Sequence, residues 1–148
     1  MPYFELTELE ALIPAEWLLQ ALDDENSGTA EMFEAARSAA EGEINGWIGL
    51  RYLLPIDPVP PFIKDAALKL AAELCYARRG QIEQFPWTNA LNVLRGNLTA
   101  PGVFARIATG EIPLYPLAAP AAGAATKSAP AVSGERSKVH TRHGSTMC

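Results

Sequence analysis

Apolar residues recur at steps of three and four along most of residues 1–116, the spacing that places them on one face of an α-helix. The longest run follows Thr29, a residue type that caps helices, and predicts a helix over residues 29–48. Shorter segments of the same spacing follow a Thr7–Glu10 capping box and Pro14. The pattern therefore predicts an all-α fold, a small helical bundle of four to five helices. The shorter helical segments are 7–12, 15–22, 86–95 and 103–109.

One segment, residues 61–79, is apolar on almost every side. A proline opens it and Arg78-Arg79-Gly80 closes it, as expected for a helix. Between Ala66 and Ala77 only Lys69 and Glu73 carry charge. A helix with this pattern is normally covered on several sides. Because the other predicted helices are short, we expect self-association to supply part of the cover.

Prolines and glycines mark the irregular parts of the chain. Four prolines between residues 51 and 61 predict a rigid, extended strap between two helices. Residues 111–115 alternate in polarity and predict a short edge strand, because Pro113 is not compatible with a central one. Gly42 and Gly46 lie four residues apart in the long helix and predict close approach of another backbone there.

Composition divides the chain near residue 116. The chain has 148 residues, 49% of them hydrophobic, which fits one globular domain over 1–116. Residues 117–148 hold no aromatic residue and are rich in Ala, Pro, Gly, Ser and Thr, so we expect this tail to be disordered unless a partner binds it.

The net charge of −5 is unevenly distributed along the chain. Residues 1–50 carry eleven acids and one base, whereas the tail carries four bases and one acid. Such asymmetry favours self-assembly or a charged partner.

The predicted domain offers little catalytic chemistry. It has no Walker loop, GxSxG, GxGxxG or HExxH motif, and both histidines, His140 and His143, lie in the tail. Cys75 lies on the apolar helix and is expected to be a core residue, far from Cys148. We therefore expect no enzyme, no catalytic residue and no cofactor. No signal peptide or membrane span is predicted, so we expect synthesis in a reducing cytoplasm.

One acidic turn has the spacing of a calcium-binding loop. Five residues occupy positions 1, 3, 5, 6 and 12 of an EF-hand pattern. Glu at position 3 and Ala30 at position 8 depart from that pattern. We therefore favour a simple acidic turn and no metal site. The weak candidate ligands are Asp23, Glu25, Ser27 and Glu34, with Gly28 at the turn.

Several pieces, taken in order, resemble a known family. The most specific is Arg51-Tyr52-x-Leu54-Pro55-Ile56, which follows Glu43–Ile48. Over residues 3–114 the chain resembles the Mu-like bacteriophage small helical proteins, long filed as a domain of unknown function. These are similar to head–tail connector proteins, also called adaptor or head-completion proteins. The tail beyond Pro116 is expected to lie outside the resemblance. The other pieces are Tyr3-Phe4-x-x-Thr7-x-x-Glu10, the Asp23–Gly28 turn, Pro60-Pro61-x-Ile63-Lys64, Tyr76–Arg79 and Ile107-Ala108-x-Gly110-x-Ile112-x-Leu114.

The resemblance implies a structural subunit of the phage neck. Such subunits form a ring, usually a dodecamer, beneath the portal protein, and present a surface to a tail-side neck protein such as a stopper or tail terminator. Genomic DNA passes through the lumen without sequence-specific binding, and the location is the capsid–tail junction of the virion. No catalytic residue and no membrane are implied. Our interface candidates are Trp47, Arg51, Tyr52, Phe62, Arg78, Arg79, Lys127, Arg136, Lys138 and Arg142.

Two other functions stay open. The chain could be another neck or tail-completion protein. It could also be a small helical DNA-binding regulator, although it lacks a helix rich in Arg, Lys, Asn and Gln to enter a groove, and its basic spot at Arg78-Arg79 is small. Under the connector hypothesis, part of the acidic N-terminal half faces the channel, since a lumen that lets DNA slide should not neutralise phosphates. The tail would then become ordered on the portal or on a neighbouring subunit.

Overall fold

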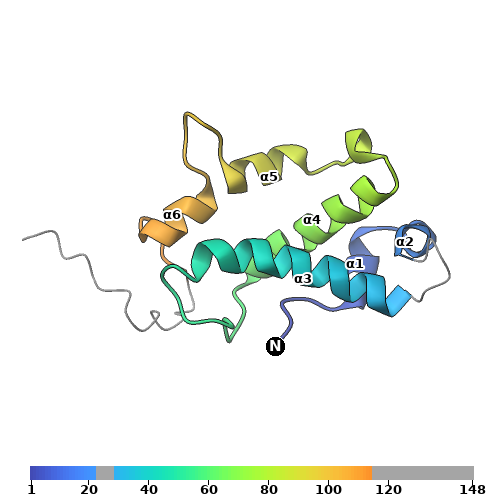
Figure 1. The fold of residues 1–148 in the computed structure, drawn as a ribbon, viewed down its shortest axis with the longest axis horizontal. Coiled ribbons are helices and arrows are strands. Elements are labelled where there is room, and N and C mark those ends of the chain that lie inside the picture. Colours follow the sequence, from blue (N-terminus) through green and yellow to red (C-terminus); the bar gives the residue numbers. More distant parts are fainter. Residues whose placement is uncertain (23–28, 115–148) are drawn as a thin grey trace, which may run out of the picture.

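A computed structural model describes residues 1–22 and 29–114, and these residues form an all-α bundle, as predicted (Figure 1). The described residues form six α-helices rather than four to five, one for each of the six helical segments of the sequence pattern. A 3₁₀ turn, η1 (Ile82–Gln84), precedes α5. The helices are α1 (Leu6–Leu12), α2 (Ala15–Leu22), α3 (Thr29–Ile48), α4 (Pro61–Arg78), α5 (Thr88–Arg95) and α6 (Val103–Thr109).

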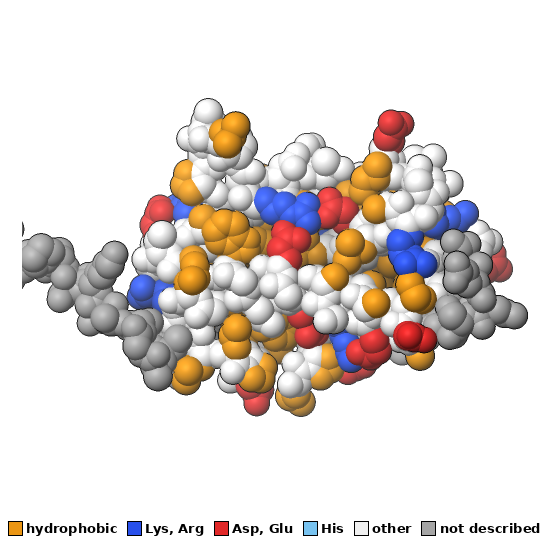
Figure 2. Space-filling model, viewed as in Figure 1, with side chains coloured by type: hydrophobic (Ala, Val, Ile, Leu, Met, Phe, Trp, Pro, Cys, Tyr) orange, Lys and Arg blue, Asp and Glu red, His pale blue; other side chains and the backbone are white. Residues whose placement is uncertain are grey.

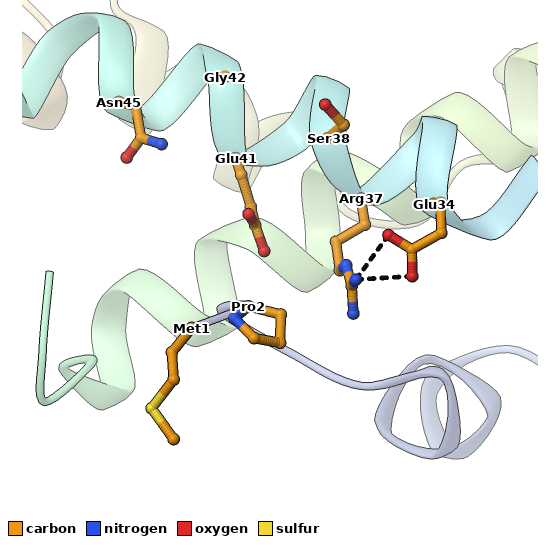
Figure 3. A pocket seen from close by; sticks show the side chains of 8 residues that line it. All are labelled: Met1, Pro2, Glu34, Arg37, Ser38, Glu41, Gly42 and Asn45. Atoms are coloured by element: carbon orange, nitrogen blue, oxygen red, sulfur yellow. Dashed lines mark hydrogen bonds and ion pairs between the residues drawn. The ribbon is translucent and has the colours of Figure 1, made fainter. Parts of the chain in front are cut away.

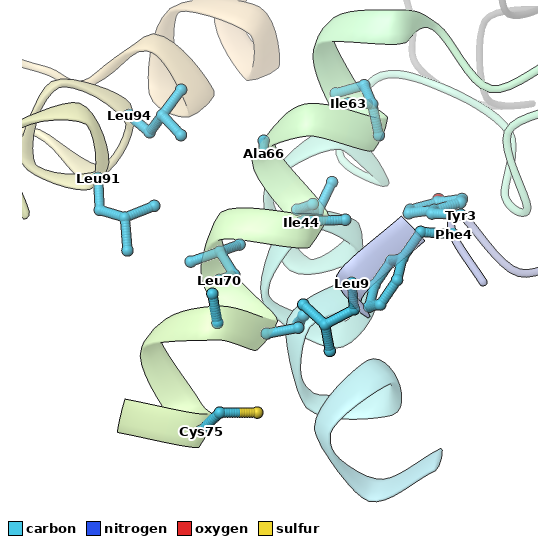
Figure 4. Packing of buried hydrophobic residues seen from close by; sticks show 14 of the residues in the cluster. Tyr3, Phe4, Leu9, Ile44, Ile63, Ala66, Leu70, Cys75, Leu91 and Leu94 are labelled. Carbon is cyan, nitrogen blue, oxygen red and sulfur yellow. The ribbon is translucent and has the colours of Figure 1, made fainter. Parts of the chain in front are cut away.

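The two long helices, α3 and α4, pack against each other and form the centre of the fold (Figures 1 and 4). Helices α1, α2 and α5 also contact α4, and α6 contacts α3 and α5. The buried side of α4 includes Ile63, Leu70 and Cys75, each at most 1% exposed. Helix α4 is therefore the central helix that its apolar pattern predicts. Its cover comes from the same chain, so its composition is not evidence for self-association.

Helix α1 begins earlier than its sequence suggests. Its first residue is Leu6 and its N-cap is Glu5, whose backbone N–H donates to Oε2 of Glu8 at 2.9 Å. The capping pair is thus Glu5 and Glu8, not Thr7 and Glu10. The cause is tertiary: Tyr3 and Phe4 are buried in the core, 2% and 1% exposed, and this fixes where the chain can turn into the helix.

The strap between α3 and α4 follows an irregular path, as its prolines predict. Tyr52, Ile56 and Pro60 are buried and anchor it to the bundle, whereas Leu53 and Leu54, between the first two anchors, are exposed. The predicted edge strand near 111–115 is wrong for the part that the structure describes, since residues 111–114 form no strand. Residues 1–22 and 29–114 contain no strand that could pair with them. The Leu114 N–H instead donates to the hydroxyl of Tyr52 at 3.2 Å, and Leu114 is buried.

Within the described residues, no backbone comes close to Gly42 or Gly46, contrary to the expectation from their spacing. Both are exposed, and a Cβ built at either one has no atom within 4 Å.

We therefore expect Gly42→Ala and Gly46→Ala each to raise the free energy of unfolding by about 0.5–1 kcal/mol, because alanine loses less backbone entropy than glycine when the helix forms. Urea denaturation followed by circular dichroism measures this. A lower stability in either variant would contradict the open surface.

Candidate functional site

The interface candidates of the strap region do not share one surface. Trp47 is half-buried and packs against the core cluster. Tyr52 is only 6% exposed and its hydroxyl accepts the hydrogen bond from Leu114, so its side chain belongs to the interior of the subunit. Phe62, at the start of α4, is 40% exposed. Of these three aromatic candidates, Phe62 is the one most open to a partner.

Four residues at the beginning of the strap form an exposed apolar surface with one cation, which we call the strap corner: Leu50, Arg51, Leu53 and Leu54. The leucines are 68%, 47% and 43% exposed, respectively. The Arg51 guanidinium lies beside the C-terminal end of α6, where a Cβ at Gly110 would be 2.3 Å from its Nη1 atom. Figure 2 shows hydrophobic side chains, with acidic ones among them, along the lower edge of the molecule, where Figure 1 places the strap and the N-terminal segment.

The arginine pair at the end of α4 holds α2 in place. Nε of Arg78 donates to the carbonyl oxygen of Ala21 at 3.1 Å. The guanidinium of Arg79 stacks over the ring of Trp17, 4.7 Å from its centroid. With Gln20 and Ala21 the two arginines line a polar hollow of about 410 Å³. Both arginines therefore have a structural contact within the subunit, and neither is simply displayed to a phosphate backbone.

Another arginine, Arg95, joins three helices, although no sequence pattern singled it out. Arg95 of α5 forms paired hydrogen bonds with Glu43 of α3, at 2.6 and 2.9 Å, and with Glu73 of α4, at 3.0 and 2.7 Å. The hydrogen bonds that Arg95 donates to Glu43, and then those that it donates to Glu73, raise the pKa of Arg95 above its ordinary value. The only sequence signal was an arginine in the last turn of an amphipathic helix, which also fits ordinary C-terminal charge.

A groove of about 480 Å³ runs between the N-terminal segment and α3 (Figure 3). Its charged side chains are already engaged. Arg37 pairs with Glu34 at 2.5 Å, and Glu41 accepts a hydrogen bond from the Tyr3 backbone N–H at 2.7 Å. Burial raises the pKa of the Tyr3 hydroxyl, which donates to Asn45. Because these groups bind one another, the groove presents no free acid–base pair. It is lined by Met1, Pro2, Glu34, Arg37, Ser38, Glu41, Gly42 and Asn45.

A second, apolar groove lies between α1 and α2 and has a volume of about 260 Å³. Leu6 and Leu18 form part of its floor, and Leu19, which is 51% exposed, lies at its side. The exposed carboxylates of Glu10 and Glu16 flank it. The sequence did not indicate this groove. Its one sequence signal is that Leu19 follows the buried Leu18 on a short helix, so the two leucines cannot face the same side.

The weak metal candidates do not come together in the described part of the chain. Asp23, Glu25, Ser27 and Gly28 lie outside the described residues, and Glu34 forms an ion pair with Arg37. No group of three or more His, Cys, Asp or Glu side chains in 1–22 and 29–114 has the geometry to hold a metal ion. The basic tail candidates also lie outside the described residues. They are Lys127, Arg136, Lys138 and Arg142.

Comparison with known families identifies the chain. The family model described as Bacteriophage Mu, Gp36 matches residues 3–132, which is most of its length. The chain belongs to the bacteriophage Mu Gp36 family. No curated protein and no solved structure matches the chain significantly.

Membership in the Gp36 family confirms a phage protein of the Mu-like group that the motifs resembled. The family match also extends past Pro116, into the segment that we expected to lie outside the resemblance. About half of the basic tail therefore belongs to the sequence that the family shares. Among the helices that the structure describes, none is both long and apolar enough to cross a membrane.

The buried Cys75 of this Gp36-family chain should not react while the protein is folded. Burial raises the pKa of its thiol to about 11, and the side chain is fully buried. In a Cys148→Ser variant we therefore expect almost no reaction with a thiol reagent at pH 8, and one thiol per chain after unfolding in guanidinium. A thiol that reacts fully in the native protein would contradict the packing around α4.

Proposed function

We propose that this chain is a structural subunit of the phage neck, a head–tail connector that forms a ring under the portal and joins the capsid to the tail. The observation that carries the proposal is the family match over residues 3–132. It agrees with the ordered motifs of residues 3–114, of which the Arg51-Tyr52-x-Leu54-Pro55 strap is the most specific. A ring of twelve copies is the size that the resemblance suggests.

The surface of the subunit supports an assembly role. In the described residues, the strap corner exposes the apolar side chains of three leucines, and Leu98 exposes another in the loop between α5 and α6, in a subunit that already has a closed core. Several described carboxylates form ion pairs within the subunit, among them those of Glu34, Glu43, Glu73 and Glu111. The thiol of Cys75 is buried. These features favour a protein that binds other proteins over an enzyme.

In this proposal genomic DNA passes through the lumen and is not bound. An acidic lining suits that task, because non-specific DNA affinity comes from neutralising phosphates with Lys and Arg. Glu31, at the exposed start of α3 and in no ion pair among the described residues, is suited to face the channel. Purified protein should then leave duplex DNA unshifted at physiological salt. An assembled neck with α3 on its outer wall would refute the acidic lining.

The proposed partners are a second copy of the chain, the portal protein and a tail-side neck protein. The basic tail is proposed to bind the portal or a neighbouring subunit. The subunit would be made in the host cytoplasm and would be located at the capsid–tail junction of the virion.

A chain truncated after residue 117 should keep the circular dichroism spectrum of a helical protein and should no longer attach to the portal. Unchanged attachment would remove the tail from the proposal.

The proposal is tested by mixing the purified full-length chain with the portal protein of the same phage. Light scattering gives the stoichiometry, and negative-stain imaging shows the shape. Rings or ring-shaped caps on the portal support a connector. A monomer or dimer that ignores the portal and shifts duplex DNA would instead support a regulator and would overturn the proposal.

A further inference from the structure

Two surfaces at opposite ends of the long axis of the subunit complement each other. The strap corner lies at the end where α3 stops, and the α1–α2 groove lies at the end where α2 stops (Figure 1). The first surface is apolar with one cation, and the second is apolar with two carboxylates. We propose that the strap corner of one copy docks into the α1–α2 groove of the next copy. This inference rests on the proposed ring function and names the faces that build the ring.

The charges on the two faces are free to pair between copies. Among the described residues Arg51 forms no ion pair, and neither do Glu10 and Glu16. Most other described cations, including Lys64, Lys69 and Arg106, already have a carboxylate partner. An Arg51 guanidinium brought to the acidic rim of the groove would gain that partner. Such pairs fix the register of an interface more than they strengthen it.

The apolar side chains of the two surfaces are of the same kind, and the strap corner is held in a fixed shape. Leu50 and Leu53 expose side chains of the same kind as the Leu19 wall of the groove. The strap is anchored by the buried Tyr52 within this surface and by the buried Ile56 and Pro60 after it, and its prolines restrict the backbone further. A surface that is already held in shape loses little conformational entropy on binding. The strap corner is therefore better suited to insertion than a free loop would be.

Because the two faces differ and lie at opposite ends, the contact is heterologous. Each copy uses one face of each kind, so the interaction repeats around a closed ring if the rotation per copy closes, and makes a filament if it does not. A two-fold dimer would instead place the same patch against itself. The two cases can be separated by crosslinking.

The test uses variants of the full chain that each carry one accessible cysteine in a Cys148→Ser background, with the buried Cys75 left in place. Leu19→Cys marks the groove and Leu53→Cys marks the strap corner, and both side chains are about half exposed. After treatment with a short bis-maleimide crosslinker, a mixture of the two variants should give a mixed dimer, and either alone should stay monomeric. A chain with both cysteines should give a ladder of oligomers. The matched control pairs Leu98→Cys, fully exposed at a distant loop, with Leu53→Cys and should give no mixed dimer.

Charge reversal gives a second readout in the same assay. Arg51→Glu in the Leu53→Cys chain, or Glu16→Arg in the Leu19→Cys chain, should lower the mixed dimer by about fivefold. Combining both reversals should restore it. Either reversal without effect, or both without recovery, would contradict the proposed register.

Other occupants of the groove would appear as other products. A strap-to-strap dimer from Leu53→Cys alone would mean an isologous contact and would overturn the inference. Crosslinking of Leu19→Cys to the native Cys148, when that residue is retained, would mean that the tail fills the groove and would also overturn it. Portal-bound rings without the mixed Leu19–Leu53 product would overturn this inference alone. Absence of any ring with the portal would overturn the proposed function itself.

Discussion

Leu70→Ala is expected to lower the free energy of unfolding by about 3 kcal/mol, the typical cost of removing a fully buried leucine side chain. Leu70 is 1% exposed and lies on α4 within the cluster that Figure 4 draws. Both α3 and α5 pack against α4, so three helices surround the cavity that the substitution leaves. Closely packed helices relax only partly into such a cavity, and lost dispersion contacts add to the lost hydrophobic transfer energy.

Leu98→Ala is the matched control for Leu70→Ala. Leu98 is 107% exposed at the tip of the loop between α5 and α6, so the same atoms are removed from a side chain that contacts water. We expect its free energy of unfolding to stay within about 0.5 kcal/mol of the parent value. Urea denaturation of both variants, read by circular dichroism, gives the comparison. Equal effects of the two substitutions would contradict the assignment of α4 to the centre of the bundle.

Gly102→Ala is expected to lower the free energy of unfolding by about 3 kcal/mol, at the upper end of the usual cost of overpacking. A Cβ at Gly102 would lie 2.3 Å from the carbonyl oxygen of Leu94 and 2.3 Å from the carbonyl carbon of Arg95. Both are backbone atoms and cannot rotate away. The φ angle of Gly102 is −74°, which any residue adopts, so the cost comes from lack of space. To admit the methyl group, α6 must move away from α5.

Gly42→Ala is the matched control, because it adds the same methyl group to an exposed helical position with no atom within 4 Å. The two Gly→Ala substitutions should therefore change stability in opposite directions. Movement of α6 would also disturb the buried Phe104 and Ile107, so Gly102→Ala should weaken the near-ultraviolet circular dichroism signal. A Gly102→Ala protein as stable as its parent would show that the end of α5 and the start of α6 do not meet closely.

Some of the candidate surface could be predicted from the sequence, and some could not. The proline-rich strap was predictable because proline restricts its own backbone and that of the preceding residue. Within it, a sequence cannot tell that Tyr52 is buried while Leu53 and Leu54 are exposed, since an irregular path has no fixed period. The Arg95 contacts with Glu43 and Glu73 were also unpredictable, because their partners are 52 and 22 residues away.

Local sequence patterns were enough to predict the helical class, the bounds of α2, α3, α4 and α6 to within a residue, and the central place of α4. The helical class and the helix bounds follow from apolar periodicity, helix caps and proline positions, which reflect interactions between residues close in the chain. Tertiary structure alone decided that α1 begins at Leu6, that residues 111–114 form no strand, and that α4 is covered by its own chain. It also decided where the strap corner and the α1–α2 groove lie. The physical reason is that these outcomes depend on which distant side chains exclude water together, and that is settled only when the helices pack.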